Sequence, residues 1–171
     1  MRKALFFTLV FCLAAIAANA QKAADFSGKW NLDIAKSELG QAAAMIKSQT
    51  LTITQADGSF KVTTQTERNP STDGPGGGAG SGRAIAPGPM EQSYTLDGKE
   101  VSTERQTPNG AVTTKTKAEQ SGNKVVVTTI FPGPNGEMKQ TSTYELSPDG
   151  KTLTVTKESP RGSNKSVYTK G

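Results

Sequence analysis

Histidine is absent from this 171-residue chain, and cysteine occurs once, at Cys12. These two residue types supply most structural zinc ligands, the commonest general base and the thiol nucleophile. One cysteine cannot form a disulfide within a chain. The composition therefore excludes a disulfide framework, a zinc site of the usual ligands and a His-dependent catalytic triad. We expect no metal and no cofactor.

Paired inward carboxylates, which could divide acid and base roles, are also missing. The relevant glutamates mostly take outward positions in the strands predicted below: Glu91, Glu100, Glu104, Glu119 and Glu145. No serine stands beside a lysine or another base in a nucleophile arrangement. An isomerase or hydrolase would need a pocket carboxylate with a perturbed pKa, and the sequence offers none. We expect the protein not to be an enzyme.

The first 20 residues have the three parts of a secretory signal peptide. A basic start at 1–3 precedes an apolar run at 4–17, and Ala18-Asn19-Ala20 forms a small-x-small cleavage site. The apolar run is too short to span a membrane. We predict cleavage after Ala20, one mature domain over 21–171, and a secreted or periplasmic location.

The mature chain alternates polar and apolar residues in many short segments. Strict period-two alternation rich in Thr and Val is typical of half-buried antiparallel strands. It occurs at 50–54, 60–62, 94–96, 144–146 and 152–156. The chain is therefore predicted to be folded and all-β.

Tight-turn dipeptides separate these segments and set the topology. Asp-Gly and Asn-Gly supply the positive φ that two-residue hairpin turns need, and from residue 97 onward turns recur every 12 to 14 residues. This spacing predicts an up-and-down meander in which each strand pairs with the next, closed into a barrel of 8–10 strands because closure removes exposed edges. The predicted strands lie near 28–34, 49–56, 59–67, 90–96, 99–106, 111–119, 124–131, 137–146, 151–158 and 164–170.

Two long connections interrupt the meander. Residues 35–48 contain the run 41–47, which predicts one short helix capped at Ser37 between the first two strands. Residues 69–89 are rich in Gly and Pro and are predicted to form a flexible loop.

The inward positions divide the barrel into an apolar end and a polar end. Near the turns at 57, 97, 122 and 149, the apolar end, they are Leu51, Ile53, Phe60, Val62, Tyr94, Leu96, Val101, Val125, Tyr144, Leu146, Leu153 and Val155. Toward the polar end, where both long connections fall, they include Thr64, Gln92, Thr103, Arg105, Thr114, Thr129, Gln140 and Ser142. A barrel filled at one end and covered by loops at the other is the geometry of a small-molecule container.

Six inward residues are candidate ligand contacts: Gln92, Tyr94, Arg105, Gln140, Ser142 and Tyr144. Arg105 could orient an anionic head group, or it could be a solvated charge at the rim. The three amide and hydroxyl residues could line a polar pocket, or they could hydrogen-bond one another in a collapsed interior. The two tyrosines could instead be core packing.

The segment Phe26-Ser27-Gly28-Lys29-Trp30-Asn31-Leu32 resembles the start of the lipocalin and fatty-acid-binding (calycin) superfamily. That superfamily has a Gly-x-Trp at the first strand, which implies that Gly28 and Trp30 form a structural plug at the closed end of the barrel. With the repeated Asp-Gly-Lys turns at 97–99 and 149–151, the chain also resembles secreted bacterial lipocalin-like families. It departs from the fatty-acid-binding pattern on the last strand, where Tyr168 has Ser166 in place of the expected Arg.

The basic character of the chain does not indicate nucleic acid. The net charge is +5, Lys and Arg are spread over nearly every strand, and aromatic residues make up 6%. The outward positions are mostly Thr, Lys and Gln, so we expect no membrane-embedded surface. We expect a monomer.

Two functions fit these observations. The leading hypothesis is a secreted or periplasmic lipocalin-like protein that binds and transports a small hydrophobic or amphipathic molecule inside the barrel, without catalysis. The alternative is a structural or interaction module of the cell envelope whose barrel is filled by its own side chains and which acts through its surface or the 69–89 loop. The low apolar content favours this alternative somewhat, since a thin core leaves little hydrophobic surface for a ligand.

Overall fold

The computed structural model describes residues 23–69, 88–107, 110–133 and 136–171. The predicted signal peptide, its cleavage site after Ala20 and nearly all of the predicted 69–89 loop lie outside the described residues. The described residues form an all-β structure with one short α-helix, α1 (Ala42–Met45). Its strands are β1 (Gly28–Leu32), β2 (Ile46–Ala56), β3 (Ser59–Arg68), β4 (Met90–Thr95), β5 (Asp97–Thr107), β6 (Gly110–Ser121), β7 (Lys124–Gly133), β8 (Gly136–Leu146), β9 (Thr152–Ser159) and β10 (Gly162–Lys170).

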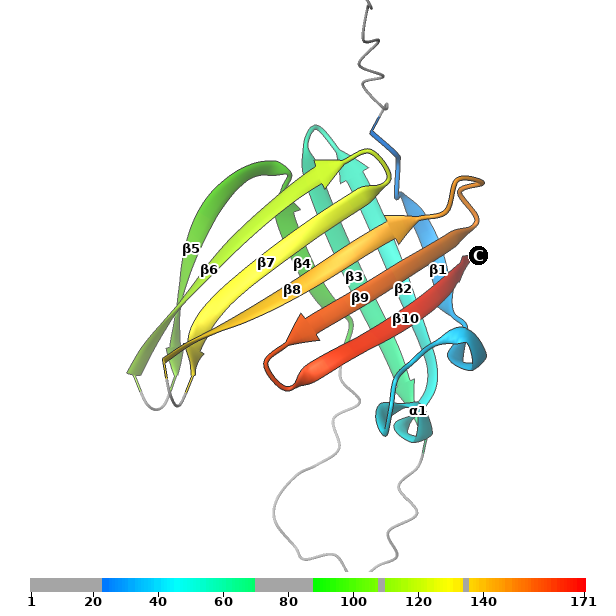
Figure 1. Cartoon of the computed structure of the whole chain (residues 1–171), viewed down its shortest axis with the longest axis horizontal. Coiled ribbons are helices and arrows are strands. Elements are labelled where there is room, and N and C mark those ends of the chain that lie inside the picture. Colours follow the sequence, from blue (N-terminus) through cyan, green and yellow to red (C-terminus); the bar gives the residue numbers. More distant parts are fainter. Residues whose placement is uncertain (1–22, 70–87, 108–109, 134–135) are drawn as a thin grey trace, which may run out of the picture.

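The strands form one antiparallel sheet that curves into a nearly closed barrel. The order in the sheet is β4-β3-β2-β1-β10-β9-β8-β7-β6-β5. The first strand, β1, pairs with the last strand, β10, and Trp30 lies opposite Lys170. In Figure 1, β1 to β4 lie behind β5 to β10. The predicted fold class and the ten-strand meander are confirmed.

One expected pairing is wrong. β4 and β5 follow each other in the chain, yet they are the two edges of the sheet and do not pair. The reason is the conformation of the connection: Leu96 N–H donates to Gly58 O of the β2–β3 turn at 2.7 Å, and Asp97 Oδ1 accepts from Lys99 N–H at 3.0 Å. These bonds hold the end of β4 on β3, while β5 diverges to pair with β6 (Figure 1). A seam therefore remains between β4 and β5.

The helical connection also differs from its prediction. A 3-10 turn, η1 (Ile34–Lys36), forms first and is capped by the Asp33 side chain, which accepts from Lys36 N–H at 3.2 Å. Ser37 does not cap α1. Its hydroxyl accepts from Val167 N–H at 2.8 Å, which attaches the connection to β10. α1 starts five residues later and lies at the polar end of the barrel (Figure 1).

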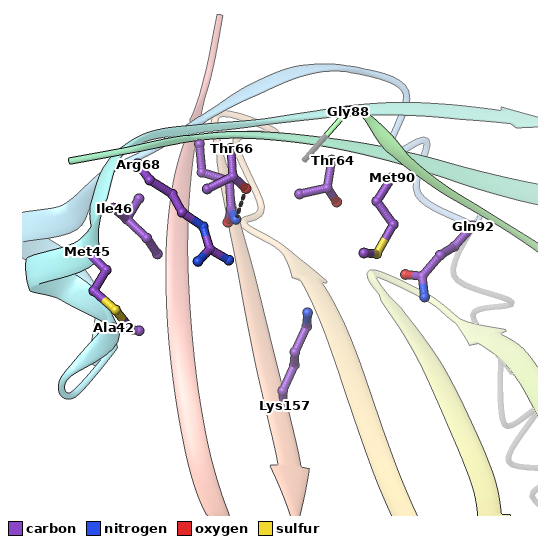
Figure 2. A pocket seen from close by; sticks show the side chains of 11 residues that line it. Ala42, Met45, Ile46, Thr64, Thr66, Arg68, Gly88, Met90, Gln92 and Lys157 are labelled. Carbon is purple, nitrogen blue, oxygen red and sulfur yellow. Dashed lines mark hydrogen bonds between the residues drawn. The ribbon is translucent and has the colours of Figure 1, made fainter. Parts of the chain in front are cut away.

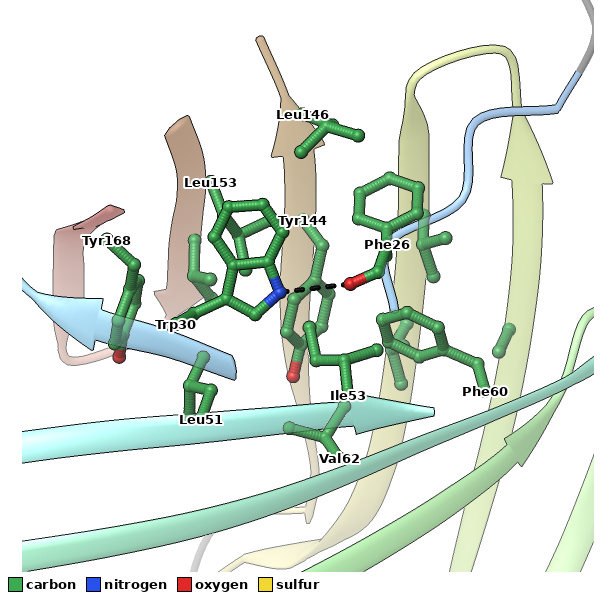
Figure 3. Close-up of a cluster of buried hydrophobic side chains, with 14 residues drawn as sticks. Phe26, Trp30, Leu51, Ile53, Phe60, Val62, Tyr144, Leu146, Leu153 and Tyr168 are labelled. Atoms are coloured by element: carbon green, nitrogen blue, oxygen red, sulfur yellow. Dashed lines mark hydrogen bonds between the residues drawn. The ribbon is translucent and has the colours of Figure 1, made fainter. Parts of the chain in front are cut away.

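The core fills the apolar end. Phe26, Trp30 and Phe60 are each fully buried, and Phe60 packs edge-on against Phe26 and Tyr144 at centroid distances of 5.8 and 5.2 Å. The Trp30 indole Nε1–H donates to Phe26 O at 2.9 Å, so its polar atom is satisfied inside the core (Figure 3). These large side chains come from β1, β3, β8 and the segment just before β1, and their burial fills this end of the barrel.

Candidate functional site

A cavity of about 340 Å³ lies at the polar end, between the core and α1. This is within the range of cavities that hold small organic ligands. Helix α1 and strands β2, β3, β4 and β9 contribute most of its wall (Figure 2). The lining residues are Ala42, Met45, Ile46, Gln49, Thr64, Thr66, Arg68, Gly88, Met90, Gln92 and Lys157.

Strand alternation places two cations in this cavity. On β3 the inward row begins with the buried Phe60 and Val62 and continues through Thr64 and Thr66 to Arg68. On β9 the buried Leu153 and Val155 precede Lys157. Because side chains two residues apart share a face, the strands that supply the core at one end present Arg68 and Lys157 at the other.

The position of Arg68 depends on an irregularity in β2. The register shifts between Ile46 and Ser48, which leaves Ile46 directly opposite Arg68. Lys47 is omitted from the register and pairs its ammonium with Glu67 at 3.8 Å. The bulge thus keeps Ile46 and Arg68 together in the cavity wall.

Two lining residues, Gln49 and Thr66, belong to a short hydrogen-bonded chain that continues to Tyr168 behind the cavity wall. The Tyr168 hydroxyl donates to Gln49 Oε1 at 2.6 Å, and Gln49 Nε2–H donates to Thr66 Oγ1 at 2.8 Å. Burial raises the pKa of Tyr168 to about 12, so its hydroxyl stays protonated and remains a donor at physiological pH. These three polar side chains satisfy one another, which ties β10, β2 and β3 into one wall.

No acidic residue is among the side chains that line the cavity. In the part of the chain that the structure describes, neither Arg68 nor Lys157 has an ion-pair partner. Solvent reaches the Lys157 side chain, but the surrounding walls desolvate its ammonium and lower its pKa. The described residues that line the cavity therefore include two cations and no carboxylate.

Two methionines lie at the mouth. Met45 of α1 and Met90 of β4 are 55% and 62% exposed, the most exposed large apolar side chains at this end. Met side chains are flexible and polarisable and adapt to differently shaped apolar partners. Figure 2 shows Met45 and Ile46 on one side of the two cations and Met90 on the other, so apolar side chains border the cations from both sides.

The predicted contact residues occupy different places. Gln92 lines the cavity (Figure 2). Tyr94 lines a smaller cavity of about 160 Å³ at the β4–β5 seam, where burial raises its pKa. Arg105 is in β5 opposite Val112, and its side chain is not among those described.

The other three predicted contacts are on β8. Tyr144 is buried in the core against Phe60, and desolvation raises its pKa well above its ordinary value. Gln140 and Ser142 are half-buried, and Ser142 is directly opposite Lys157 in the sheet register. Ligand contact by these residues stays a prediction.

The residues predicted to form the plug are both at the apolar end. Gly28 has φ +138°, and a Cβ there would lie 3.2 Å from Lys170 Cε, so the position favours glycine. Lys170 Nζ lies 5.2 Å from the Trp30 ring centroid, within cation–π range.

Sequence reasoning missed Arg68 and Lys157. The signal was present: extending the inward rows 60-62-64 and 153-155 by two positions at a time reaches 68 and 157. Charged residues at strand ends are usually solvated rim positions, so the alternation alone does not mark these two as cavity residues.

The described residues give no evidence of metal or membrane-spanning helices. They contain no group of three or more His, Cys, Asp or Glu side chains that could hold a metal ion. Within the same ranges, no helix is long and apolar enough to cross a membrane.

The chain is similar in structure to several solved proteins. No protein-family model matches the sequence, and no curated protein matches it. A structure described as "REP1-NXSQ fatty acid transporter" has a TM-score of 0.54 at 18% identity, over 87% of this chain and 98% of that one. Human cRBP IV has a TM-score of 0.53 at 15% identity, over 86% and 99%. A Schistosoma mansoni fatty acid binding protein, solved with arachidonic acid, has a TM-score of 0.51 at 16% identity, over 89% and 98%.

These matches span nearly the whole of each compared protein at low sequence identity, so they show a shared fold. The closed apolar end, the ten-stranded meander and the structural matches agree with one another. The chain shares its barrel fold with these solved proteins.

Proposed function

We propose that the protein binds and carries a small amphipathic molecule in the barrel interior, without catalysing a reaction. The single observation that carries this proposal is the 340 Å³ cavity at the polar end, with apolar and cationic side chains on its wall. A barrel filled by its own side chains would leave no such space. The cavity also begins where the core ends, so a ligand can enter without disrupting the packed rings.

The likeness to known structures supports the same function. Two of the similar proteins are described as a fatty acid transporter and a fatty acid binding protein. The present chain shares their fold but has its own cavity wall. On β10 the buried Tyr168 hydroxyl is bonded to Gln49, and Ser166 is the residue two positions before it. A ligand would therefore meet its cations on β3 and β9.

The location and assembly of the protein are part of the proposal. The residues 1–20 support export to the periplasm or beyond, where a carrier would move a poorly soluble molecule through water. We propose that it acts as a monomer, since the cavity is built within one barrel.

Native mass spectrometry of the protein, purified without detergent, tests the proposal. A mass excess that disappears on denaturation would show a bound molecule and give its mass. The same spectrum reports whether the protein is a monomer. The bare polypeptide mass, unchanged after incubation with a mixed lipid extract, would contradict the carrier function and favour action through the surface.

A cavity-filling variant provides the matched control. Thr64 faces the cavity and Thr63 faces outward on the same strand. Thr64→Trp should abolish the mass excess, because the indole would occupy the ligand space. Thr63→Trp should retain it. Equal retention in both variants would show that the molecule binds elsewhere.

A further inference from the structure

Two cations face the same space from opposite walls of the cavity. The Arg68 guanidinium projects from β3 and the Lys157 ammonium from β9, and Figure 2 shows both pointing into the cavity. Strands β3 and β9 are not neighbours in the sheet, so this meeting exists only because the barrel curves round. Both groups are positively charged, so an anion placed between them would be attracted by both.

The neighbouring side chains do not supply that anion. Gln49 is hydrogen-bonded to both Thr66 and Tyr168, and Ser142 opposite Lys157 is neutral. The remaining lining side chains are Ala42, Met45, Ile46, Thr64, Met90 and Gln92. None of them carries charge, so no group on the described wall neutralises the pair.

The two positive charges of the site favour a head group with two negative charges over one with a single negative charge. A single carboxylate carries one negative charge on two oxygens, which match one guanidinium fork. A phosphate monoester carries nearly two negative charges near neutral pH and has three strong acceptor oxygens. It can accept from a guanidinium on one wall and an ammonium on the other at the same time, and it balances both charges.

We propose that the molecule carried in this cavity is an amphiphile with a phosphate monoester head group held between Arg68 and Lys157. Its alkyl chain lies against Met45 and Ile46, the apolar side chains next to Arg68 in the same cavity (Figure 2). This inference rests on the proposed carrier function and names its ligand class.

Calorimetric titration of the full chain with four probes tests the inference. The probes are decyl phosphate, decanoate, decanol and inorganic phosphate, each below micelle formation and at about pH 8, where a phosphate monoester carries close to two charges. Decyl phosphate should bind at least about tenfold more tightly than decanoate, decanol or inorganic phosphate, because only decyl phosphate supplies both the dianion and the chain.

Matched variants connect the binding to the two cations. Arg68→Met and Lys157→Met should each weaken decyl phosphate binding by about tenfold or more and leave decanol binding unchanged. Arg161→Met and Lys139→Met remove the same charges from exposed positions outside the cavity lining and should have little effect. Arg68→Lys and Lys157→Arg retain the charge and should restore part of the affinity. Circular dichroism of each variant checks that the barrel is folded.

Each of the other possible outcomes would reject a different part of the inference. Equal affinity for decyl phosphate and decanol, unaffected by the cation variants, would reject an anionic ligand while leaving the carrier function intact. Equal affinity for decanoate would reject the requirement for a dianion. Equal affinity for inorganic phosphate would show that the chain contributes nothing. Absence of binding by all four probes, together with the bare native mass, would reject the carrier function itself.

Discussion

The two ends of the barrel are built on the same strands but have different physical properties. On β3, Phe60 and Val62 are buried in the aromatic core, and six residues further along Arg68 borders a water-accessible cavity. Among the described residues, no buried side-chain nitrogen or oxygen lacks a hydrogen-bond partner. At the apolar end the buried rings pack against one another, whereas the polar end holds two cations that have no ion-pair partner among the described residues.

Residues of the same strand therefore have different roles: those in the core stabilise the fold, and those at the cavity are placed to contact a ligand. Deleting large side chains from a packed core loses apolar burial and leaves a cavity, whereas exposed side chains at a cavity mouth contribute little to folding. We therefore expect substitutions to change mainly the free energy of unfolding at one end and mainly ligand affinity at the other.

The largest expected effect is at the apolar end. Phe60→Ala should lower the free energy of unfolding by about 3–5 kcal/mol, since it removes a fully buried ring that contacts two other aromatic side chains. The control at the polar end is Met90→Ala, where the side chain is mostly exposed and the loss should be below about 1 kcal/mol. Urea denaturation measures both. Similar losses for the two variants would contradict the division between the ends.

Much of this division could be predicted from sequence. Period-two alternation placed Phe60, Val62, Leu153 and Val155 in the core, because one face of each strand must be buried. Asp-Gly turns gave the strand boundaries to within about three residues. The turn at Asp57-Gly58, where both residues have positive φ, has the backbone geometry that its dipeptide predicts.

The rest depends on contacts between distant parts of the chain. The turn at Asp97-Gly98 resembles a hairpin, but the bond from Leu96 to Gly58 O keeps β4 away from β5. Similarly, Arg68 and Lys157 are ordinary charged residues near strand ends. That they share a cavity follows from the curvature that brings β3 opposite β9, which no local pattern specifies.

A smaller effect is expected at the boundary between the two ends. Tyr168→Phe removes the hydrogen bond to Gln49 and should lower the free energy of unfolding by about 0.5–1.5 kcal/mol. Tyr94→Phe is the matched control, because the described residues offer its hydroxyl no hydrogen bond, and it should be near neutral. Urea denaturation at neutral pH compares the two variants. An equal loss of unfolding free energy in both variants would show that the Tyr168–Gln49 hydrogen bond does not stabilise this part of the barrel.

The smallest effect concerns the charge at the polar end. Because burial lowers the pKa of Lys157 below its ordinary value of 10.5, the folded protein releases this proton before the unfolded chain does. The free energy of unfolding should therefore rise with pH between the lowered pKa and 10.5, and at neutral pH the protonated lysine should disfavour folding. Lys157→Met removes this term, so the variant should be at least as stable as the wild type at neutral pH, without ligand.

The pH dependence is measured as the difference between wild type and Lys157→Met in thermal melts at a series of pH values. Ionisation of the tyrosines, with the Tyr168 pKa raised to about 12, occurs in both proteins and cancels in this difference. The advantage of the variant should shrink as pH approaches 10.5. A wild type that is clearly more stable than the variant at neutral pH would mean that a group in the protein already stabilises the ammonium. The Lys157 charge would then already be compensated within the protein, and the cavity would give no electrostatic reason to bind an anionic ligand.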